Sequence, residues 1–173
     1  KNYGYACMNM QLSNPQDYGG KKKDRITTNR SMIKRTFQEK GIEYASSLSL
    51  QNVLDLQKVL EWNVEHGIHF FRLSSNVFPW ASEYQLCDMP DYEAIWDACE
   101  RAGNYAREQG IRLTSHPGPF NKLASPNEKV FENTKRDLEI HGEIFDLMCL
   151  PRTPYAKINI HVGAAYDDKS MAL

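Results

Sequence analysis

Short apolar stretches alternate along the chain with longer stretches in which apolar residues recur at helical spacing. The short stretches predict β-strands over residues 2–8, 68–74, 111–115 and 157–162, and the longer ones predict amphipathic helices between them. Helix-length crossovers indicate parallel strands, because parallel neighbours need a connection of about a dozen residues or more. The pattern therefore predicts an α/β domain built on a parallel sheet.

Turn and capping residues set the expected limits of three helices. The first helix should end at Gly67, and the second should run from an N-cap at Asp91 to a stop at Gly110. The third should begin with Ser125 as its cap, with Glu128 reaching back to close a capping box. The expected buried faces are Leu50, Val53, Leu54, Leu60 and Val64; Ile95, Ala98, Ala102, Tyr105 and Ala106; and Phe131, Thr134, Leu138, His141, Phe145 and Met148.

Four strands and three complete helices are too few for a closed β/α barrel. A (β/α)8 barrel of the TIM type usually needs about 250 residues, and this chain has 173. We therefore expect a single partial barrel domain over residues 1–173, with about the first four strands and three helices of a TIM barrel. Residues 167–173 resemble the first turn of a fourth helix, so the domain would be truncated at Leu173.

Composition narrows the class of protein. The mean hydropathy is −0.61, and no apolar run approaches the roughly 18 residues of a membrane-spanning helix, so no membrane association is expected. The spacing of Cys7, Cys87, Cys99 and Cys149 fits neither a zinc site nor a dense disulfide framework. We expect reduced cysteines in an intracellular protein, cytoplasmic in a prokaryote and nuclear or mitochondrial in a eukaryote.

Two histidines follow the predicted strands at the end of the sheet where parallel α/β folds place functional residues. His116 follows the third strand and His161 lies at the end of the fourth, so their rings should lie at neighbouring strand tips. Two imidazoles there would suit a divalent metal, which can activate water for attack on a phosphate. The alternative is a pair of hydrogen-bonded structural residues, and no carboxylate stands at a comparable strand end. His141, on the apolar stripe of the third helix, is expected to be a core residue.

A basic segment follows the first predicted strand. Residues 21–40 contain eight lysines and arginines and two acidic residues, a net charge of +6. The side chains expected to contact phosphates are Lys21, Lys22, Lys23, Arg25 and Arg30. A solvated loop without a ligand is the alternative for such a run. Beyond the tip of the second strand, Phe78 and Trp80 could stack on an unpaired base or pack in the core.

Six short motifs, in order and spacing, resemble the UV damage endonuclease family over essentially the whole chain. The motifs are Gly4–Asn9, Thr27–Arg30, Trp62–Ser75, Phe78–Ser82, His116–Gly118 and His161–Tyr166. That family has a TIM-type barrel related to endonuclease IV, with a multinuclear divalent metal site at the carboxyl ends of its strands. It repairs DNA by nicking the backbone 5′ to ultraviolet photoproducts such as cyclobutane pyrimidine dimers and 6-4 products. The resemblance thus implies a metal-dependent phosphodiesterase acting on double-stranded DNA that carries UV lesions.

The resemblance also implies roles for individual residues. His116 and His161 match two metal-binding histidines of the family, whose metal is often Mn²⁺; Zn²⁺ and Mg²⁺ are the alternatives. Tyr5 and Asn9 match residues near the lesion. After His-Pro-Gly the family usually has a glutamine and an aromatic residue that wedge into the DNA, and this sequence has Pro119 and Phe120 instead. Phe120 can still insert between bases, whereas Pro119 lacks both an amide side chain and a backbone donor.

The family takes its remaining metal ligands from the second half of the barrel, and nothing in this sequence supplies them. We therefore expect this chain to be an incomplete part of such an enzyme, inactive unless the missing C-terminal half complements it. Two alternatives remain. One is a metal-dependent sugar isomerase or epimerase of similar barrel architecture, and the other is a half-barrel that binds DNA without cutting it.

Overall fold

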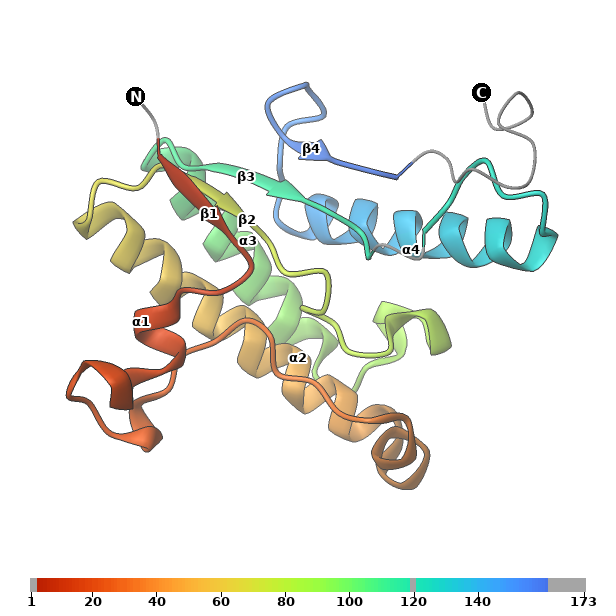
Figure 1. Ribbon diagram of the computed structural model, residues 1–173, viewed down its shortest axis with the longest axis horizontal. Helices are drawn as coiled ribbons and strands as arrows, with labels where there is room; N and C mark the ends of the chain where they lie inside the picture. The colour runs from red at the N-terminus through yellow and green to blue at the C-terminus, as the bar shows by residue number, and fades with distance from the viewer. Residues whose placement is uncertain (1–2, 119–120, 162–173) are drawn as a thin grey trace.

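The computed structural model of the chain describes residues 3–118 and 121–161. Its centre is a sheet of four parallel strands, each paired with its neighbours in the sequence (Figure 1). The strands are β1 (Gly4–Ala6), β2 (Phe70–Arg72), β3 (Arg112–Ser115) and β4 (Lys157–Ile158). The predicted α/β class, parallel sheet and strand positions are confirmed, and each strand is shorter than the apolar stretch that contains it. The predicted start of a further helix at 167–173 lies outside the described residues.

The register of the strands places alternate residues on opposite faces of the sheet. Tyr5, Phe71 and Leu113 are aligned in one row, and Phe71 and Leu113 are buried in the core against the helices. The next row, on the other face, consists of Ala6, Arg72, Thr114 and Lys157. In that row, Arg72 Nε and Thr114 Oγ1 are buried without a hydrogen-bond partner among the described residues. The helix-facing row is therefore largely apolar, whereas the opposite row carries polar groups.

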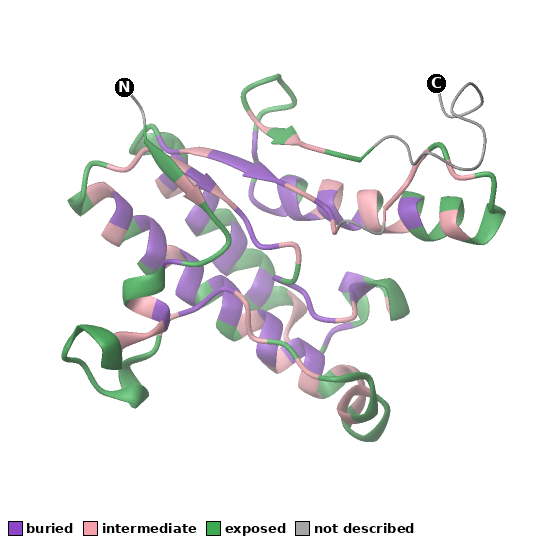
Figure 2. Ribbon diagram, in the orientation of Figure 1, coloured by how far each residue is buried: buried purple, intermediate pink, exposed green. Residues whose placement is uncertain are grey.

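Three long helices connect the strands: α2 (Lys34–Glu65), α3 (Tyr92–Glu108) and α4 (Glu128–Leu147). α2 and α3 run side by side along the sheet, and α4 lies beside β3 and β4 (Figure 1). The shorter elements are α1 (Met10–Ser13) and the 3-10 turns η1 (Pro15–Tyr18), η2 (Lys22–Asp24), η3 (Ala81–Glu83) and η4 (Leu86–Asp88). Buried residues gather where the helices face each other and the sheet (Figure 2).

Helix α2 extends further towards the N-terminus than its apolar pattern indicates. Its first half buries the small residues Ala45, Ser46 and Ser49 around one large apolar residue, Leu48, so the helical period is weak there. A kink at Gly41, where φ is 66°, separates a short first segment from the rest. Only the half beginning near Leu50 carries a clear apolar period, and the helix ends before Gly67 as predicted.

The predicted N-caps are correct at one helix and wrong at another. Asp91 does precede α3, but its carboxylate accepts a hydrogen bond from Ser46 Oγ at 2.7 Å instead of capping the helix. The predicted cap of α4 at Ser125 is wrong. Asn127 is the N-cap, and its Oδ1 accepts from the Val130 backbone N–H at 3.2 Å. Ser125 Oγ accepts from the Asn127 N–H and so shapes the turn before the helix.

Most predicted core positions of the helices are confirmed. The buried ones are Val53, Leu60, Ile95, Ala98, Ala102, Ala106, Thr134, His141, Phe145 and Met148. Those partly buried are Leu50, Val64, Tyr105 and Leu138. Leu54 and Phe131 are wrong, with 41% and 38% of their surface exposed. Leu54 falls outside the buried stripe of α2, and Phe131 lies in the first turn of α4, which reaches past the strands in Figure 1.

The structure bears on two expectations from composition, the state of the cysteines and the character of the helices. All four cysteines are free thiols, as expected. Within residues 3–118 and 121–161, none of the helices combines the length and the apolar character that a membrane span requires.

The backbone of α3 at Gly103 lies so close to the end of α4 that adding one methyl group there should destabilise the fold. A Cβ on Gly103 would lie 1.8 Å from the Met148 carbonyl oxygen. We expect Gly103→Ala to lower the free energy of unfolding by about 2–3 kcal/mol, because backbone must move to relieve the overlap. Gly142→Ala on α4 is the matched control, since a Cβ there meets no atom within 4 Å. It should be neutral or stabilising by up to about 1 kcal/mol, and urea denaturation of both variants checks the difference.

Burial also predicts the reactivity of the thiols. Cys99 is buried in the core, which raises the pKa of its thiol to about 12, whereas Cys7, Cys87 and Cys149 are exposed. Since the thiolate is the reactive form, we expect a thiol reagent at pH 8 to modify three cysteines in the native protein. The fourth should react only after denaturation. Rapid native labelling of Cys99, detected by peptide mass spectrometry, would contradict this packing.

Candidate functional site

His116 and His161 lie together at the ends of two paired strands. Ser115 at the end of β3 is aligned with Ile158 of β4, and the Asn159 N–H donates to the Ser115 carbonyl at 2.9 Å. This pairing brings the centres of the His116 and His161 rings to 4.8 Å, with the ring planes at 89°. His116 is half-buried and His161 is exposed. The predicted proximity of the two rings at neighbouring strand tips is therefore confirmed.

The donor chemistry of this pair fits part of a metal centre. Imidazole nitrogens bind zinc at about 2.0–2.1 Å, and rings this close can each direct one nitrogen to a shared ion. A complete centre needs further ligands, however. In residues 3–118 and 121–161, no group of three or more His, Cys, Asp or Glu side chains is arranged to hold a metal ion. The two histidines thus supply two donors, and their role as ligands stays a prediction.

Tyr5 and Asn9 are joined in a hydrogen-bonded chain that ends on α2. The Tyr5 hydroxyl donates to Asn63 Oδ1 at 2.6 Å and accepts from Asn9 Nδ2 at 3.0 Å. Asn9 Oδ1 in turn accepts from the Leu12 N–H and caps α1. Burial raises the pKa of Tyr5, and its bonds with Asn9 and Asn63 act in the opposite direction. The phenol therefore stays protonated at neutral pH, held from both sides.

Asn63 is a residue of this chain of contacts that sequence reasoning missed. It is fully buried on α2, and its Nδ2 has no hydrogen-bond partner among the described residues. Tyr5 itself belongs to the helix-facing row of the sheet, where its ring packs edge-on against Phe71 with centres 5.1 Å apart. The contact of Tyr5 and Asn9 with a lesion stays a prediction, as do the roles of Pro119 and Phe120, which lie outside the described residues.

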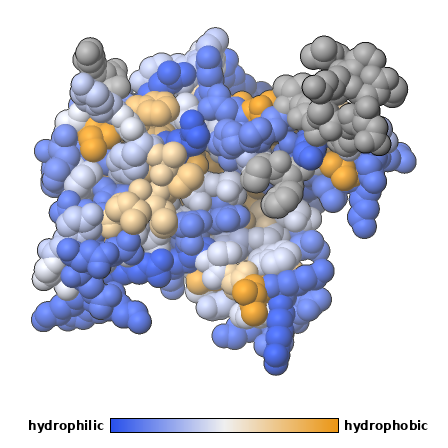
Figure 3. Space-filling model, viewed as in Figure 1, coloured by the Kyte–Doolittle hydropathy of each residue, from blue (hydrophilic) through white to orange (hydrophobic). Residues whose placement is uncertain are grey.

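The basic segment contains cations in two different settings. Lys21, Lys22, Lys23 and Arg25 are all exposed, around the turn η2. In Figure 3 the corner of the molecule that this loop forms is strongly hydrophilic. These four side chains are free to meet a polyanion, which is what the phosphate-contact prediction requires.

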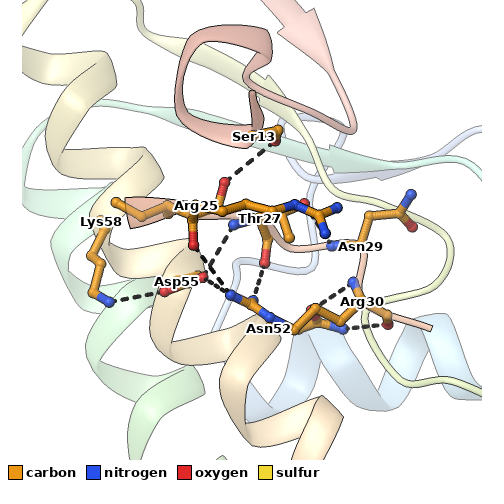
Figure 4. A network of polar contacts seen from close by, with 9 residues as sticks. Ser13, Arg25, Thr27, Asn29, Arg30, Asn52, Asp55 and Lys58 are labelled. Atoms are coloured by element: carbon orange, nitrogen blue, oxygen red, sulfur yellow. Dashed lines mark hydrogen bonds and ion pairs between the residues drawn. The ribbon is translucent and has the colours of Figure 1, made fainter. Parts of the chain in front are cut away.

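Arg30 differs from these four cations, because its guanidinium is already paired (Figure 4). Its Nη2 lies 2.6 Å from Asp55 Oδ2, its Nη1 donates to the Thr27 carbonyl at 2.6 Å, and only 22% of its side chain is exposed. Asp55 is buried and also accepts from the Thr27 N–H and from Lys58 Nζ. Asn52 holds the Arg30 backbone by its N–H and its carbonyl. Arg30 therefore stabilises the fold of this loop, and the prediction of a phosphate contact is weakest there.

The same loop is tied to the carboxyl ends of two strands. Thr28 Oγ1 donates to the Cys7 carbonyl just after β1, at 3.2 Å. Ser74, which follows β2, donates from Oγ to Asn29 Oδ1 at 2.9 Å. The motif Thr27–Arg30 thus closes over the end of the sheet at which the histidines lie.

The aromatic residues beyond β2 are packed within the protein. Phe78 is 4% exposed and belongs to the core. Trp80 stacks on Phe37 with ring centres 5.8 Å apart, and its Nε1 donates to the Met32 carbonyl at 3.0 Å. Of the two roles considered for these residues, the structure favours packing.

A polar groove runs between the loop after β2 and the start of α4. Two adjoining cavities of about 280 and 360 Å³ form it, and both are lined by Ser75, Asn76, Ser82 and Asp137. The second cavity also reaches Gly118 and Asn121 on the loop that carries His116. The groove therefore reaches the loop that carries His116, although that histidine lines neither cavity.

Comparison with known proteins gives one consistent result. A family model described as UV-endonuclease UvdE matches residues 1–173. The UV-damage endonuclease of Schizosaccharomyces pombe is 38% identical over 176 residues, covering 98% of this chain and 27% of that protein. The UV DNA damage endonuclease of Clostridium perfringens is 32% identical over 170 residues, covering 98% of this chain and 37% of that protein.

A solved structure shares the fold. The crystal structure of SacUVDE matches with a TM-score of 0.79 and 27% sequence identity, covering 98% of this chain and 52% of that one. The chain therefore spans between about a quarter and a half of the length of these three relatives. This coverage is consistent with the first part of a TIM-type barrel.

The buried carboxylate of Asp55 predicts which charges are structural. Asp55→Ala should lower the free energy of unfolding by about 3 kcal/mol, because Arg30 loses its partner and the Thr27 N–H its acceptor. Lys23→Ala, in the exposed part of the same loop, is the control and should change stability by less than about 0.5 kcal/mol. Thermal and urea unfolding measure both. Equal effects of the two substitutions would show that the Asp55 network does not organise the loop.

Proposed function

The chain belongs to the UV-endonuclease UvdE family, and from that we propose that it forms the first half of a DNA-repair endonuclease barrel. The proposed reaction is hydrolysis of a phosphodiester bond 5′ to a UV photoproduct in double-stranded DNA. The observation that carries this proposal is the pair of imidazoles at adjacent strand tips, with ring centres 4.8 Å apart. In this proposal the missing C-terminal half of the barrel completes the site.

His116 and His161 would hold a divalent cation, Mn²⁺ in the first place and Zn²⁺ or Mg²⁺ as alternatives. When bound, such a cation supplies Lewis-acid chemistry for phosphate hydrolysis. The neutral form of each imidazole is the ligand, so the site requires both rings to be unprotonated. Further ligands would come from the strands that complete the barrel, because no group of three or more His, Cys, Asp or Glu side chains among the described residues is arranged to hold a metal ion.

The exposed cations Lys21, Lys22, Lys23 and Arg25 would bind the DNA backbone. Their loop is tied to the carboxyl ends of β1 and β2. Phosphates bound there would therefore lie at the same end of the sheet as the histidines. Tyr5 and Asn9 would lie near the lesion, and Pro119 with Phe120 would wedge into the duplex. A photodimer pairs poorly, so displacing it from the stack costs less than displacing normal bases. A protein with this substrate would act inside the cell, in the cytoplasm of a prokaryote or in the nucleus or mitochondrion of a eukaryote.

A half-barrel that binds DNA without cutting it is the second candidate. The observation that favours it is the lack of a third metal donor among the described residues. It differs from the first candidate in one measurable respect, because salt-dependent binding to duplex DNA would occur without incision.

A chimera tests the proposed activity. This chain replaces the matched segment of the Schizosaccharomyces pombe relative, so that the rest of that protein supplies the remaining strands. With Mn²⁺, the chimera should nick irradiated supercoiled plasmid and spare unirradiated plasmid. His116→Ala and His161→Ala should each lower the nicking rate by about 100-fold or more, because each removes a group that holds the catalytic cation.

Arg101→Ala serves as a control in the chimera, since Arg101 is exposed on α3 and its only ion pair among the described residues is with Asp97 of the same helix, so the rate should stay within about twofold. Equal nicking of irradiated and unirradiated plasmid would contradict the repair function. Retention of full activity by both histidine variants would contradict the metal pair. Tight, salt-dependent binding of the chimera to irradiated DNA with no nicking would favour the second candidate.

A further inference from the structure

One face of α4 holds both ends of the loop that carries His116. Thr134, Asp137 and His141 are spaced so that their side chains lie along the same side of the helix. Each of them bonds a different residue at or beyond the end of β3. The partner of His141 is Ser115, the last residue of β3, and the partners of Asp137 and Thr134 are Asn121 and Lys122 in the connection to α4.

At the near end of the loop, the bond joins two buried side chains. His141 Nδ1 and Ser115 Oγ lie 2.7 Å apart, and the two residues are 2% and 1% exposed. A buried polar bond of this kind fixes geometry strongly, because breaking it leaves a desolvated group without a partner. Ser115 faces α4 because it continues the helix-facing alternation of β3, and His116 follows it directly beyond the end of the strand.

At the far end, two bonds hold the chain as it approaches α4. Thr134 Oγ1 accepts from the Lys122 N–H at 2.9 Å and donates to the Val130 carbonyl at 2.8 Å. Asp137 accepts through Oδ2 from Asn121 Nδ2. The same carboxylate oxygen lies 3.8 Å from His141 Nε2, which makes no hydrogen bond with the described residues. Asp137 therefore lies between the two ends and beside both.

A histidine that served only to fill the core would need neither the bond to Ser115 nor Asp137 beside it. The sequence gives His141 only a packing role, yet an aliphatic residue would fill the same space without placing a polar atom against Ser115. His116, by contrast, has its ring against His161 and no hydrogen bond of its own side chain among the described residues. The position of the His116 ring thus depends on how its backbone is held.

We propose that Thr134, Asp137 and His141 form a clamp on α4 that positions the His116 ring against His161. We treat these three as positioning residues, because among the described residues no metal-holding group of three or more side chains includes any of them. The inference rests on the proposed function for its purpose, namely metal binding by the pair. Groups that hold metal ligands in place are worth about 10–100-fold in metal affinity.

The experiment uses two readouts, one on the 173-residue chain and its variants and one on the chimera that supplies the remaining strands. The first is the nuclear Overhauser effect between the His116 and His161 rings in the metal-free, histidine-labelled chain. The second is the affinity of the chimera for Mn²⁺ alone, followed by its electron paramagnetic resonance signal. His141→Leu should abolish the ring contact and weaken Mn²⁺ binding by about 10-fold or more.

Two further variants separate positioning from stability. His141→Asn keeps a polar group near the place of Nδ1 and should restore the ring contact, with Mn²⁺ affinity within about threefold of the parent. Ile144→Ala removes a buried side chain of α4 that bonds nothing in the loop, so it should lower the melting temperature without changing either readout. Circular dichroism checks that each variant is folded.

The outcomes are distinct. If His141→Leu keeps both the ring contact and the Mn²⁺ affinity, the clamp is overturned while the metal pair stands. If Ile144→Ala loses both readouts as fully as His141→Leu does, the role of His141 is general stability and the clamp is likewise overturned. If the parent shows the ring contact and loses it in His141→Leu, while His116→Ala leaves the Mn²⁺ affinity of the chimera unchanged, the clamp stands and the proposed function fails.

Discussion

The pairing of β3 with β4 is the constraint on which the candidate site depends. Only two residue pairs define it, Thr114 with Lys157 and Ser115 with Ile158, and the Asn159 N–H extends it by one hydrogen bond. A slip of one residue would turn every side chain of β4 to the other face and move His161 along the sheet. Because the pairing is so short, few backbone hydrogen bonds hold this register.

A second constraint acts at the other edge of the sheet. The buried carboxylate of Asp55 gathers Thr27, Arg30 and Lys58 around one anionic centre. That centre holds the loop over the ends of β1 and β2, while the lysines earlier in the loop remain exposed to solvent. The protein thus uses its basic segment in two ways: one arginine organises structure, and the cations that precede it are left available.

The sequence allowed the strands, the parallel sheet and the meeting of the two histidines to be predicted, because each depends on a local apolar run followed by a clear stop. It could not reveal the first half of α2, where small residues such as Ala45 replace a large apolar face. It placed the cap of α4 at Ser125, since either Ser125 or Asn127 can accept the first N–H groups. The hydrogen bond of Asn63 with Tyr5 and the surroundings of the second nitrogen of His141 could not be predicted. Both depend on residues that are distant in the sequence and meet only in the folded chain.

The row formed by Ala6, Arg72, Thr114 and Lys157 has a consequence for the face of the sheet turned away from the helices. Its Arg72 Nε and Thr114 Oγ1 atoms are dehydrated and unmatched within the described part of the chain. Since water is already excluded from both atoms, an unmet bond costs about 1–3 kcal/mol at each of them. Further apolar coverage would not remove that cost, whereas a matching acceptor for Arg72 and a partner for the Thr114 hydroxyl would. Polar complementarity is therefore what this face of the sheet lacks.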